Sequence, residues 1–323
     1  MKRIAVLTSG GDAPGMNAAV RSVVRTGIDQ GYEMFGVRNG YAGLISGRLI
    51  RMTSRDVGGI IDRGGTCLGT SRCEEIKCKA GRDAAIKTLE TYDIHGLIVI
   101  GGNGSQAGSH ALSAAGIRVI GIASTIDNDL VGADVSIGST TAVEIALECI
   151  DRLRTTASSH GRAFLVEVMG RNCGYLALAS GIAGGAEAIV LPEVETDPER
   201  VANEIRASYE RGKSHAIIVV AEGARYNGDK IAHYFQEHSQ RLGFELRLTK
   251  LGHIQRGGSP CAFDRILGSR LGAAAIEQLH GGIHGILLGY KQGGVVPTAL
   301  GVVATSTKTI ELSLLKLAQV LAQ

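Results

Sequence analysis

The sequence predicts an α/β protein built from two Rossmann-like, three-layer domains with largely parallel sheets. Short apolar runs alternate with stretches of helical periodicity along the chain, and most of these runs end in a glycine-bearing turn. The length of 323 residues suits two domains of ordinary size. Strands buried on both faces appear in a sequence as nearly continuous apolar runs, so these runs indicate parallel sheets covered by helices.

The first strand–turn–helix unit lies at the N-terminus. Residues 4–8 form an apolar, β-branched run, and residues 9–15 form a turn that contains three glycines. Within residues 16–29 the valines and an isoleucine fall mainly on one helical face, and two arginines fall on another. A strand, a tight turn and an amphipathic helix are therefore expected in that order.

The same unit recurs along the rest of the chain. Further strands are expected at residues 96–100, 119–122, 163–168, 188–191, 216–220 and 286–289, and the segment 244–250 leads into a loop at 251–259. Further helices are expected from the 101–102 turn through residue 115, after residue 174, and at residues 198–211, 263–278 and 310–321. The domains are expected to comprise residues 1–138 with about 255–305, and residues 139–254 with about 306–323.

Composition excludes several classes of protein. The 46 glycines are roughly twice ordinary usage, and with only five prolines they are expected at turns and close backbone approaches. A net charge of +3 and an aromatic content of 4% do not favour a nucleic-acid partner. The six cysteines form no C-x-x-C pair, which is typical of reduced thiols. No apolar run suits a signal peptide or a membrane span, so we expect a cytoplasmic protein.

Two glycine-rich turns are candidates for binding phosphate. In open parallel sheets, ligands bind beyond the carboxyl ends of the strands. The turn at residues 9–15 lacks both the G-x-x-x-x-G-K-[ST] and the G-x-G-x-x-G patterns, but it places N–H groups and a helix N-terminus directly after a strand. The turn at residues 100–105 has three glycines in four positions, and Ser105 is expected to cap the following helix.

The loop Thr-Ile-Asp-Asn-Asp at residues 125–129 is the candidate for acid–base chemistry. Two carboxylates, Asp127 and Asp129, stand two residues apart where a strand should end. One would accept a proton from an attacking hydroxyl, and the other would hold magnesium or a second proton. An Asx-turn bonded to the nearby backbone is the structural alternative.

Three arginines stand in glycine-bearing loops: Arg72, Arg171 and Arg256. Guanidinium groups bind phosphate oxygens in a forked, bidentate geometry. Three such loops fit a substrate with more than one phosphate.

Together these segments resemble the bacterial ATP-dependent 6-phosphofructokinases, phosphofructokinase family A. The resemblance rests on SGGDAPGMN at residues 9–17, TIDND at 125–129, MGR at 169–171 and GHIQRGGSP at 252–260. It implies transfer of the terminal phosphate of ATP to the 1-hydroxyl of fructose 6-phosphate, with Mg²⁺ as cofactor. It further implies a homotetramer in which the first domain binds the nucleotide and the second binds the sugar phosphate.

The resemblance assigns roles residue by residue. Asp127 matches the general base, and the other residues that match the catalytic set are Thr125, Asp129, Arg171 and Arg72. The residues that match the nucleotide site are Gly11, Arg72, Cys73, Gly102, Asn103, Gly104 and Ser105. Those that match the sugar-phosphate pocket are Thr125, Asp127, Met169, Gly170, Arg171, Glu222, His253 and Arg256, with Arg162 and Arg247 reaching the 6-phosphate from a neighbouring subunit.

The resemblance also implies an effector site between subunits, where a nucleoside diphosphate activates and phosphoenolpyruvate inhibits. The residues that match it are Arg21, Arg25, Arg154, Gly185, Glu187, Arg211, Lys213 and His215. For Arg21 and Arg25 alone, a solvated helix face is the simpler interpretation.

Two positions depart from the family pattern. Asn103 stands where an aspartate tied to magnesium is usual, which leaves Asp129 as the protein carboxylate for the metal. Ala123 and Ser124 replace a more usual proline–glycine pair before Thr125, although neither Gly104 nor Ser124 matches the aspartate and lysine of pyrophosphate-dependent relatives. A catalytically weak regulatory paralogue and a kinase with a different phosphoryl donor therefore stay open as alternatives. A dinucleotide-dependent oxidoreductase does not, because the G-x-G-x-x-G fingerprint is missing.

Overall fold

The computed structural model describes residues 2–322, and the chain forms two compact α/β units. Unit 1 comprises Met1–Thr141 and Arg256–Lys308, and unit 2 comprises Ala142–Gln255 and Thr309–Gln323. Each unit has its own sheet covered by helices, as the sequence predicts. Within residues 2–322, no helix has the length and apolar character needed to cross a membrane.

Unit 1 is built on a seven-stranded sheet with the order β11-β10-β5-β4-β1-β2-β3. The strands are β1 (Arg3–Ser9), β2 (Glu33–Val37), β3 (Leu49–Met52), β4 (Ile94–Gly101), β5 (Val119–Ala123), β10 (Ile286–Lys291) and β11 (Gly294–Ala299). The five inner strands are parallel, and the edge strands β3 and β11 pair antiparallel with their neighbours. The inner strands β1, β4 and β5 are buried almost throughout, which is why they stand out in the sequence as apolar runs.

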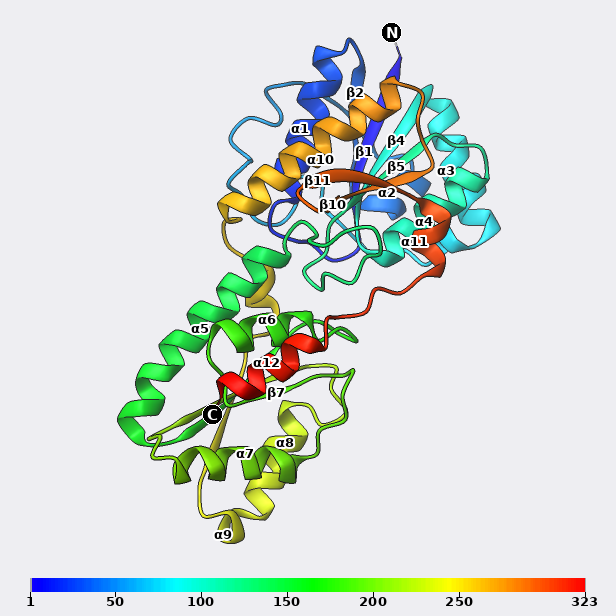
Figure 1. Cartoon of the computed structure of the whole chain (residues 1–323). Helices are drawn as coiled ribbons and strands as arrows, with labels where there is room; N and C mark the ends of the chain where they lie inside the picture. The colour runs from blue at the N-terminus through cyan, green and yellow to red at the C-terminus, as the bar shows by residue number, and fades with distance from the viewer. Residues whose placement is uncertain (1, 323) are drawn as a thin grey trace. The chain divides into compact units, whose positions relative to one another are not determined.

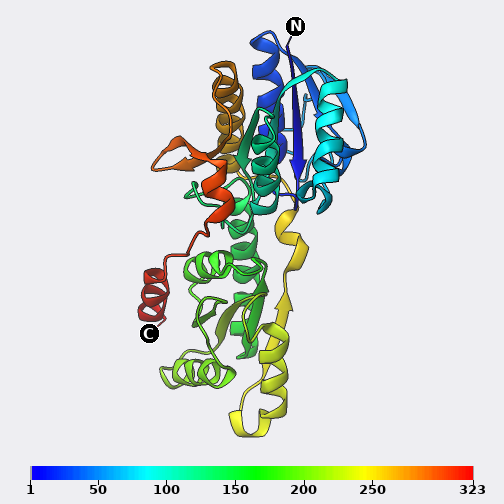
Figure 2. The same ribbon diagram turned by 90° about the vertical axis from the view of Figure 1, so that its right-hand side faces the viewer.

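Helices cover both faces of this sheet. On one face α1 (Met16–Asp29) and α10 (Ala262–His280) run side by side (Figures 1 and 2). Their close approach depends on glycine, because a Cβ on Gly272 would lie 2.7 Å from the carbonyl oxygen of Ala19. The other face carries α2 (Gly40–Ile45), η1 (Glu75–Lys77), α3 (Lys79–Thr91), α4 (Asn103–Ala114) and α11 (Leu300–Thr305).

Unit 2 has a four-stranded, all-parallel sheet with the order β7-β8-β6-β9. Its strands are β6 (Ala163–Val168), β7 (Ala188–Val190), β8 (Ala216–Ala221) and β9 (Leu246–Lys250). Its other elements are α6 (Tyr175–Ala183), α7 (Pro198–Glu210), α8 (Gly228–Glu237), α9 (Ser239–Leu242), η2 (Gly252–Arg256) and α12 (Ser313–Leu321). The C-terminal helix α12, red in Figure 2, begins three residues later than the sequence suggests.

One long helix, α5 (Ser139–His160), has no counterpart among the predicted elements. It begins directly after the boundary expected between residues 138 and 139, and it continues from unit 1 into unit 2. Its first turn is capped by a side chain from α10. The buried Asp264 carboxylate accepts hydrogen bonds from the N–H groups of Gly138 (2.8 Å) and Thr141 (2.8 Å) and from the Thr141 hydroxyl (2.5 Å). Burial raises the pKa of Asp264, although these donors favour the ionised form and oppose that rise.

Replacing this cap should destabilise the protein. Asp264→Ala is expected to lower the free energy of unfolding by about 3 kcal/mol, because it leaves buried N–H donors without an acceptor. Urea titration followed by circular dichroism measures this change. The matched control is Glu277→Gln, which neutralises an exposed carboxylate on the same helix. Equal stability of the two variants would contradict the assigned capping role.

Candidate active site

Three predicted loops of unit 1 meet at one edge of the sheet. The ends of β1, β4 and β5 are in register, since Ser9 pairs with Gly101 and Gly101 pairs with Ala123. The turns that follow these strands therefore lie next to one another. Their contact is close, because a Cβ on Gly10 would lie 3.2 Å from the Ser105 hydroxyl oxygen and one on Gly102 would lie 3.4 Å from Cβ of Thr125.

The turn after β4 delivers a helix N-terminus to this edge. Helix α4 starts at Asn103, and its N-cap is Gly102 in an extended conformation. The expectation that Ser105 caps this helix is wrong: Ser105 is the third helical residue and is buried. The helix begins earlier because glycines let the chain turn directly at the strand end, where a Cβ on Gly101 would lie 2.6 Å from the carbonyl oxygen of Ser9. The first N–H groups of α4 are available for an anion.

The loop that contains Arg72 is attached to β1 and its turn. The buried Thr8 hydroxyl bonds to the Thr66 hydroxyl (2.8 Å) and donates to the carbonyl oxygen of Gly69 (2.9 Å). The Thr70 hydroxyl donates to the carbonyl oxygen of Gly10 (2.8 Å). Arg72 follows this anchored segment and is exposed.

Its neighbour Cys73 packs against the core of unit 1. The side chain of Cys73 thus faces the interior, and a contact from this residue to a nucleotide would come from its backbone.

Arg256 also reaches the turn after β1. Its Nη1 donates to the carbonyl oxygen of Asp12 (2.7 Å), and a Cβ on Gly11 would lie 2.7 Å from the same nitrogen. Glycine at position 11 therefore leaves room for the guanidinium group. A Cβ on Gly64 would overlap the carbonyl oxygen of Gly258, so the loops at 64–72 and 256–258 are in backbone contact.

The loop after β5 holds the predicted carboxylates. Asp127 is 8% exposed, and its N–H donates to the hydroxyl oxygen of Thr125 (3.2 Å). Asp129 is half-buried, and its carbonyl oxygen accepts a hydrogen bond from Nδ2 of Asn103 (3.3 Å). Asn103 thus links the turns after β4 and β5. An aspartate at position 103 would have no proton to donate there.

The predicted residues of unit 2 gather after β6 and β8. Arg171 has a positive φ of 50°, and its N–H donates to Oε1 of Glu222 (3.1 Å). Gly170 has a φ of 134°, which favours glycine. A Cβ on Gly223 would overlap the carbonyl oxygen of Arg171, so these two strand-end turns touch through their backbones.

Sequence reasoning missed Gln255, which is fully buried in η2. Its Oε1 accepts a hydrogen bond from the N–H of Met169 (2.8 Å), next to the Arg171 turn. His253 lies exposed in the same short helix. In the sequence, the only sign of a role for Gln255 is that it is a polar residue inside the 252–260 motif.

Arg162 and Arg247 lie close together in unit 2. Arg247 is on β9 and pairs in register with Phe164 of β6, two residues after Arg162. Both side chains approach Oε2 of Glu245, at 2.8 Å for Arg247 and 3.9 Å for Arg162. Their placement suits joint binding of one anion.

Five of the residues assigned to an effector site gather in unit 2. Glu187 accepts a hydrogen bond from the N–H of Ile217 (2.6 Å) and pairs with Nζ of Lys213 (3.3 Å). Lys213 and Arg211 both donate to the carbonyl oxygen of Ala322, just after α12, at 3.0 and 3.2 Å. Cations at a helix C-terminus satisfy its last carbonyl groups, which gives these two side chains a structural role in the chain.

Arg154 completes this group, because its guanidinium donates to the carbonyl oxygen of Gly184, beside Gly185. Of the remaining assigned residues, His215 is half-buried beside Ser214, while Arg21 and Arg25 lie on α1 of unit 1.

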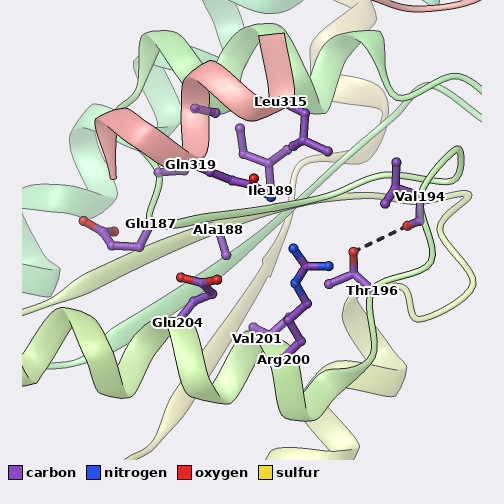
Figure 3. Close-up of a pocket in the computed structure, with 12 residues that line it drawn as sticks. Glu187, Ala188, Ile189, Val194, Thr196, Arg200, Val201, Glu204, Leu315 and Gln319 are labelled. Atoms are coloured by element: carbon purple, nitrogen blue, oxygen red, sulfur yellow. Dashed lines mark hydrogen bonds between the residues drawn. The ribbon is translucent and has the colours of Figure 1, made fainter. Parts of the chain in front are cut away.

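A small cavity of about 40 Å³ lies under α12 beside Glu187. In Figure 3 Leu315 of α12 lies above Ile189 of β7, and Arg200 and Glu204 of α7 line the opposite side. The cavity is too small for a nucleotide.

The comparisons with known proteins agree with the motifs. The family model described as Phosphofructokinase matches residues 3–279. The chain is 52% identical over 323 residues to the ATP-dependent 6-phosphofructokinase 1 of Thermus thermophilus, covering 100% of both chains. It is 49% identical over 322 residues to the ATP-dependent 6-phosphofructokinase of Halalkalibacterium halodurans, again with 100% of both covered.

Solved structures agree as well. The crystal structure of Pichia pastoris phosphofructokinase in the T-state superimposes with a TM-score of 0.88 at 36% identity, covering 94% of this chain. The chain spans only 35% of that longer yeast protein. The family match over most of the chain, together with the full-length similarity to the bacterial relatives, leads to one conclusion: this chain belongs to the phosphofructokinase family.

Proposed function

We propose that this protein is an ATP-dependent 6-phosphofructokinase, which transfers the γ-phosphoryl group of ATP to the 1-hydroxyl of fructose 6-phosphate and yields fructose 1,6-bisphosphate and ADP. The observation that carries the proposal is the in-register meeting of the turns after β1, β4 and β5, with Asp127 in the third of them. The names of the bacterial relatives support the same reaction. We place this glycolytic step in the cytoplasm.

The residues of unit 1 bind the donor. The N–H groups of the turn after β1 and of the first turn of α4 face the phosphates, and Arg72 neutralises their charge. In phosphoryl transfer, positioning and neutralisation of the equatorial oxygens account for most of the rate enhancement. The glycines at positions 11, 102 and 104 allow the phosphates to approach the backbone closely. The remaining contacts to the donor come from Asn103, Ser105 and the backbone of Cys73.

Asp127 takes the proton from the 1-hydroxyl as the new P–O bond forms. Thr125 holds the loop by accepting the N–H of Asp127. The sugar phosphate is held by residues of unit 2, in which Met169, Gly170, Arg171, Glu222 and His253 bind the sugar and Arg162 and Arg247 bind the 6-phosphate. Arg256, in unit 1, is assigned to the same substrate. As the new bond forms, the bond between the γ-phosphorus and the bridging oxygen of ATP breaks, and its electron pair stays on the β-phosphate of ADP, which leaves.

The residues near the donor fit a magnesium ion held mainly by phosphates and water. Residues 2–322 contain no cluster of three or more His, Cys, Asp or Glu side chains suited to a metal. Asp129 would supply one carboxylate and Asn103 an amide oxygen, which suits an ion that keeps several waters. When bound with the nucleotide, this ion neutralises charge on the donor phosphates.

A coupled assay tests the proposal directly. Purified protein is incubated with fructose 6-phosphate and either ATP, ADP or pyrophosphate across a magnesium series, and the bisphosphate product is measured. We expect turnover with ATP alone. Product formed from pyrophosphate or ADP, and not from ATP, would identify that compound as the phosphoryl donor. No product with any donor would favour the catalytically weak regulatory paralogue.

Asn103→Asp should lower the magnesium requirement. A carboxylate at this position adds a charged ligand for the ion, and we expect the magnesium concentration for half-maximal rate to fall about three- to tenfold. Titration calorimetry measures, without turnover, how the affinity for a non-hydrolysable ATP analogue depends on magnesium across the same series. The matched control is Ser113→Ala, at the C-terminal end of the same helix. Gly116, just after this helix, is not used because its positive φ disfavours alanine. An unchanged magnesium dependence in both readouts would show that Asn103 does not set the magnesium requirement.

Regulation and assembly belong to the same proposal. We assign a nucleoside diphosphate and phosphoenolpyruvate as effectors and a homotetramer as the working assembly. The gathering of Arg154, Glu187, Arg211 and Lys213 in unit 2 supports an anion site there. Analytical ultracentrifugation, and kinetics with each effector, test the assembly and the regulation separately.

A further inference from the structure

The loop after β5 is held by a residue that none of the assignments above includes. Asn128 has a positive φ of 50° and is 4% exposed. Left-handed backbone at a residue other than glycine costs free energy and persists where the surroundings hold it. Of the five such residues that the described chain contains, Asn128 and Arg171 lie in the strand-end loops of the proposed site.

The Asn128 side chain closes the loop on itself. Its Nδ2 donates to the carbonyl oxygen of Asp134 (2.8 Å), and its Oδ1 accepts from the N–H of Ser136 (3.0 Å). The Ser136 hydroxyl oxygen also lies 3.2 Å from Oδ1, but its single proton goes to the nearer carbonyl oxygen of Thr125. The Asn128 amide therefore both donates and accepts within the loop. These bonds join residues six and eight positions apart, beside the isolated parallel bridge between Ser124 and Ile137.

The same network reaches the residues before Asp127. The Ser136 hydroxyl donates to the carbonyl oxygen of Thr125 (2.7 Å), and the N–H of Thr125 donates to the carbonyl oxygen of Ile137 (3.1 Å). The backbone is thus fixed two residues before Asp127 and again one residue after it. With both flanks held, the direction of the Asp127 side chain is set by the loop.

We propose that Asn128 is a positioning residue for phosphoryl transfer: its side-chain bonds to Asp134 and Ser136 hold the left-handed turn that aims the Asp127 carboxylate. This inference rests on the proposed function, because it assumes that Asp127 accepts the proton. Asn128 acts through Asp127 and contacts neither reactant. Asparagine suits both tasks, because it tolerates left-handed backbone better than most residues and its amide both donates and accepts.

Asn128→Gly tests the side chain apart from the backbone. Glycine adopts the same φ without strain, so the variant keeps the turn accessible and removes the side-chain bonds to Asp134 and Ser136. We expect kcat to fall about 10- to 100-fold, because small misplacements of a reacting group cost that much, while KM for ATP and for fructose 6-phosphate changes less than about threefold. The matched control is Asp93→Gly, which replaces another residue of positive φ (53°) just before β4, at the opposite end of the strand.

Ser136→Ala provides a second, independent variant. It removes the hydroxyl bond to the carbonyl oxygen of Thr125 but keeps Asn128 and its bond from the N–H of Ser136. We expect a smaller loss of kcat, and in the double variant a loss smaller than the product of the two single losses, because both residues act through one network. This variant carries the test if Asn128→Gly does not fold.

The outcomes separate the inference from the proposed function. Wild-type protein that converts fructose 6-phosphate, with variants that keep its kcat, would overturn the inference and leave the function standing. Variants that lose only melting temperature, with kcat per folded molecule unchanged, would likewise overturn it, since they indicate a purely structural role. Wild-type protein inactive with every donor would overturn the proposed function itself.

Discussion

Asp127→Asn is expected to lower kcat for phosphoryl transfer by about 10²- to 10⁴-fold, because the amide oxygen is too weak a base to accept the proton of the 1-hydroxyl. The shape of the side chain is kept, so KM for both substrates should change little. Steady-state kinetics at saturating ATP and magnesium, with detection of the bisphosphate product, measure the effect. Thermal unfolding of the same preparation establishes that the variant is folded.

A second carboxylate of the same loop provides the control. Asp134 is exposed, and its Oδ2 accepts the N–H of Gln292 (3.0 Å) on the way from β10 to β11. Asp134→Asn removes the same charge seven residues away but keeps the backbone carbonyl oxygen that Asn128 contacts, and its kcat is expected to stay within about twofold of wild type, as is usual for exposed side chains. Equal losses in the two variants would show that loop charge, and not proton transfer at position 127, limits the rate.

Gly223→Ala is expected to disrupt the Arg171 turn of unit 2. A Cβ at position 223 would overlap the carbonyl oxygen of Arg171, and neither backbone segment can yield as a flexible side chain would. We expect the free energy of unfolding to fall by about 1–3 kcal/mol and kcat/KM for fructose 6-phosphate to fall about 10²-fold, because Arg171 and Glu222 would be displaced together.

The matched control for this change is Gly281→Ala. A Cβ there would meet only ordinary contacts, 3.5 Å from the carbonyl oxygens of Gln278 and Glu277, and the φ of −70° suits alanine. Denaturant titration and kinetics on both variants measure the contrast. Near-wild-type kcat/KM in Gly223→Ala would mean that the Arg171 turn tolerates a backbone shift and does not position a reacting group.

Much of the fold was readable from the sequence because the inner strands are buried on both faces. The runs at residues 4–8, 96–100 and 119–122 are continuous and apolar, and they became β1, β4 and β5. The edge strands β3 and β11 escaped prediction because they are half exposed and mix polar with apolar residues. Helix α5 escaped prediction because it begins at the expected domain boundary, and its cap comes from Asp264, 126 residues after Gly138.

The sequence by itself determined the fold class, most of the strands with the turns that follow them, and the family, because local apolar runs and glycine turns depend on neighbours along the chain. Only the tertiary structure decided which loops meet. It set the register of Ser9, Gly101 and Ala123, the clamp that Asn128 makes on Ser136, and the contact between Gly223 and Arg171. These are backbone and hydrogen-bond contacts between residues distant in sequence, and no local pattern records which partner a buried donor will find.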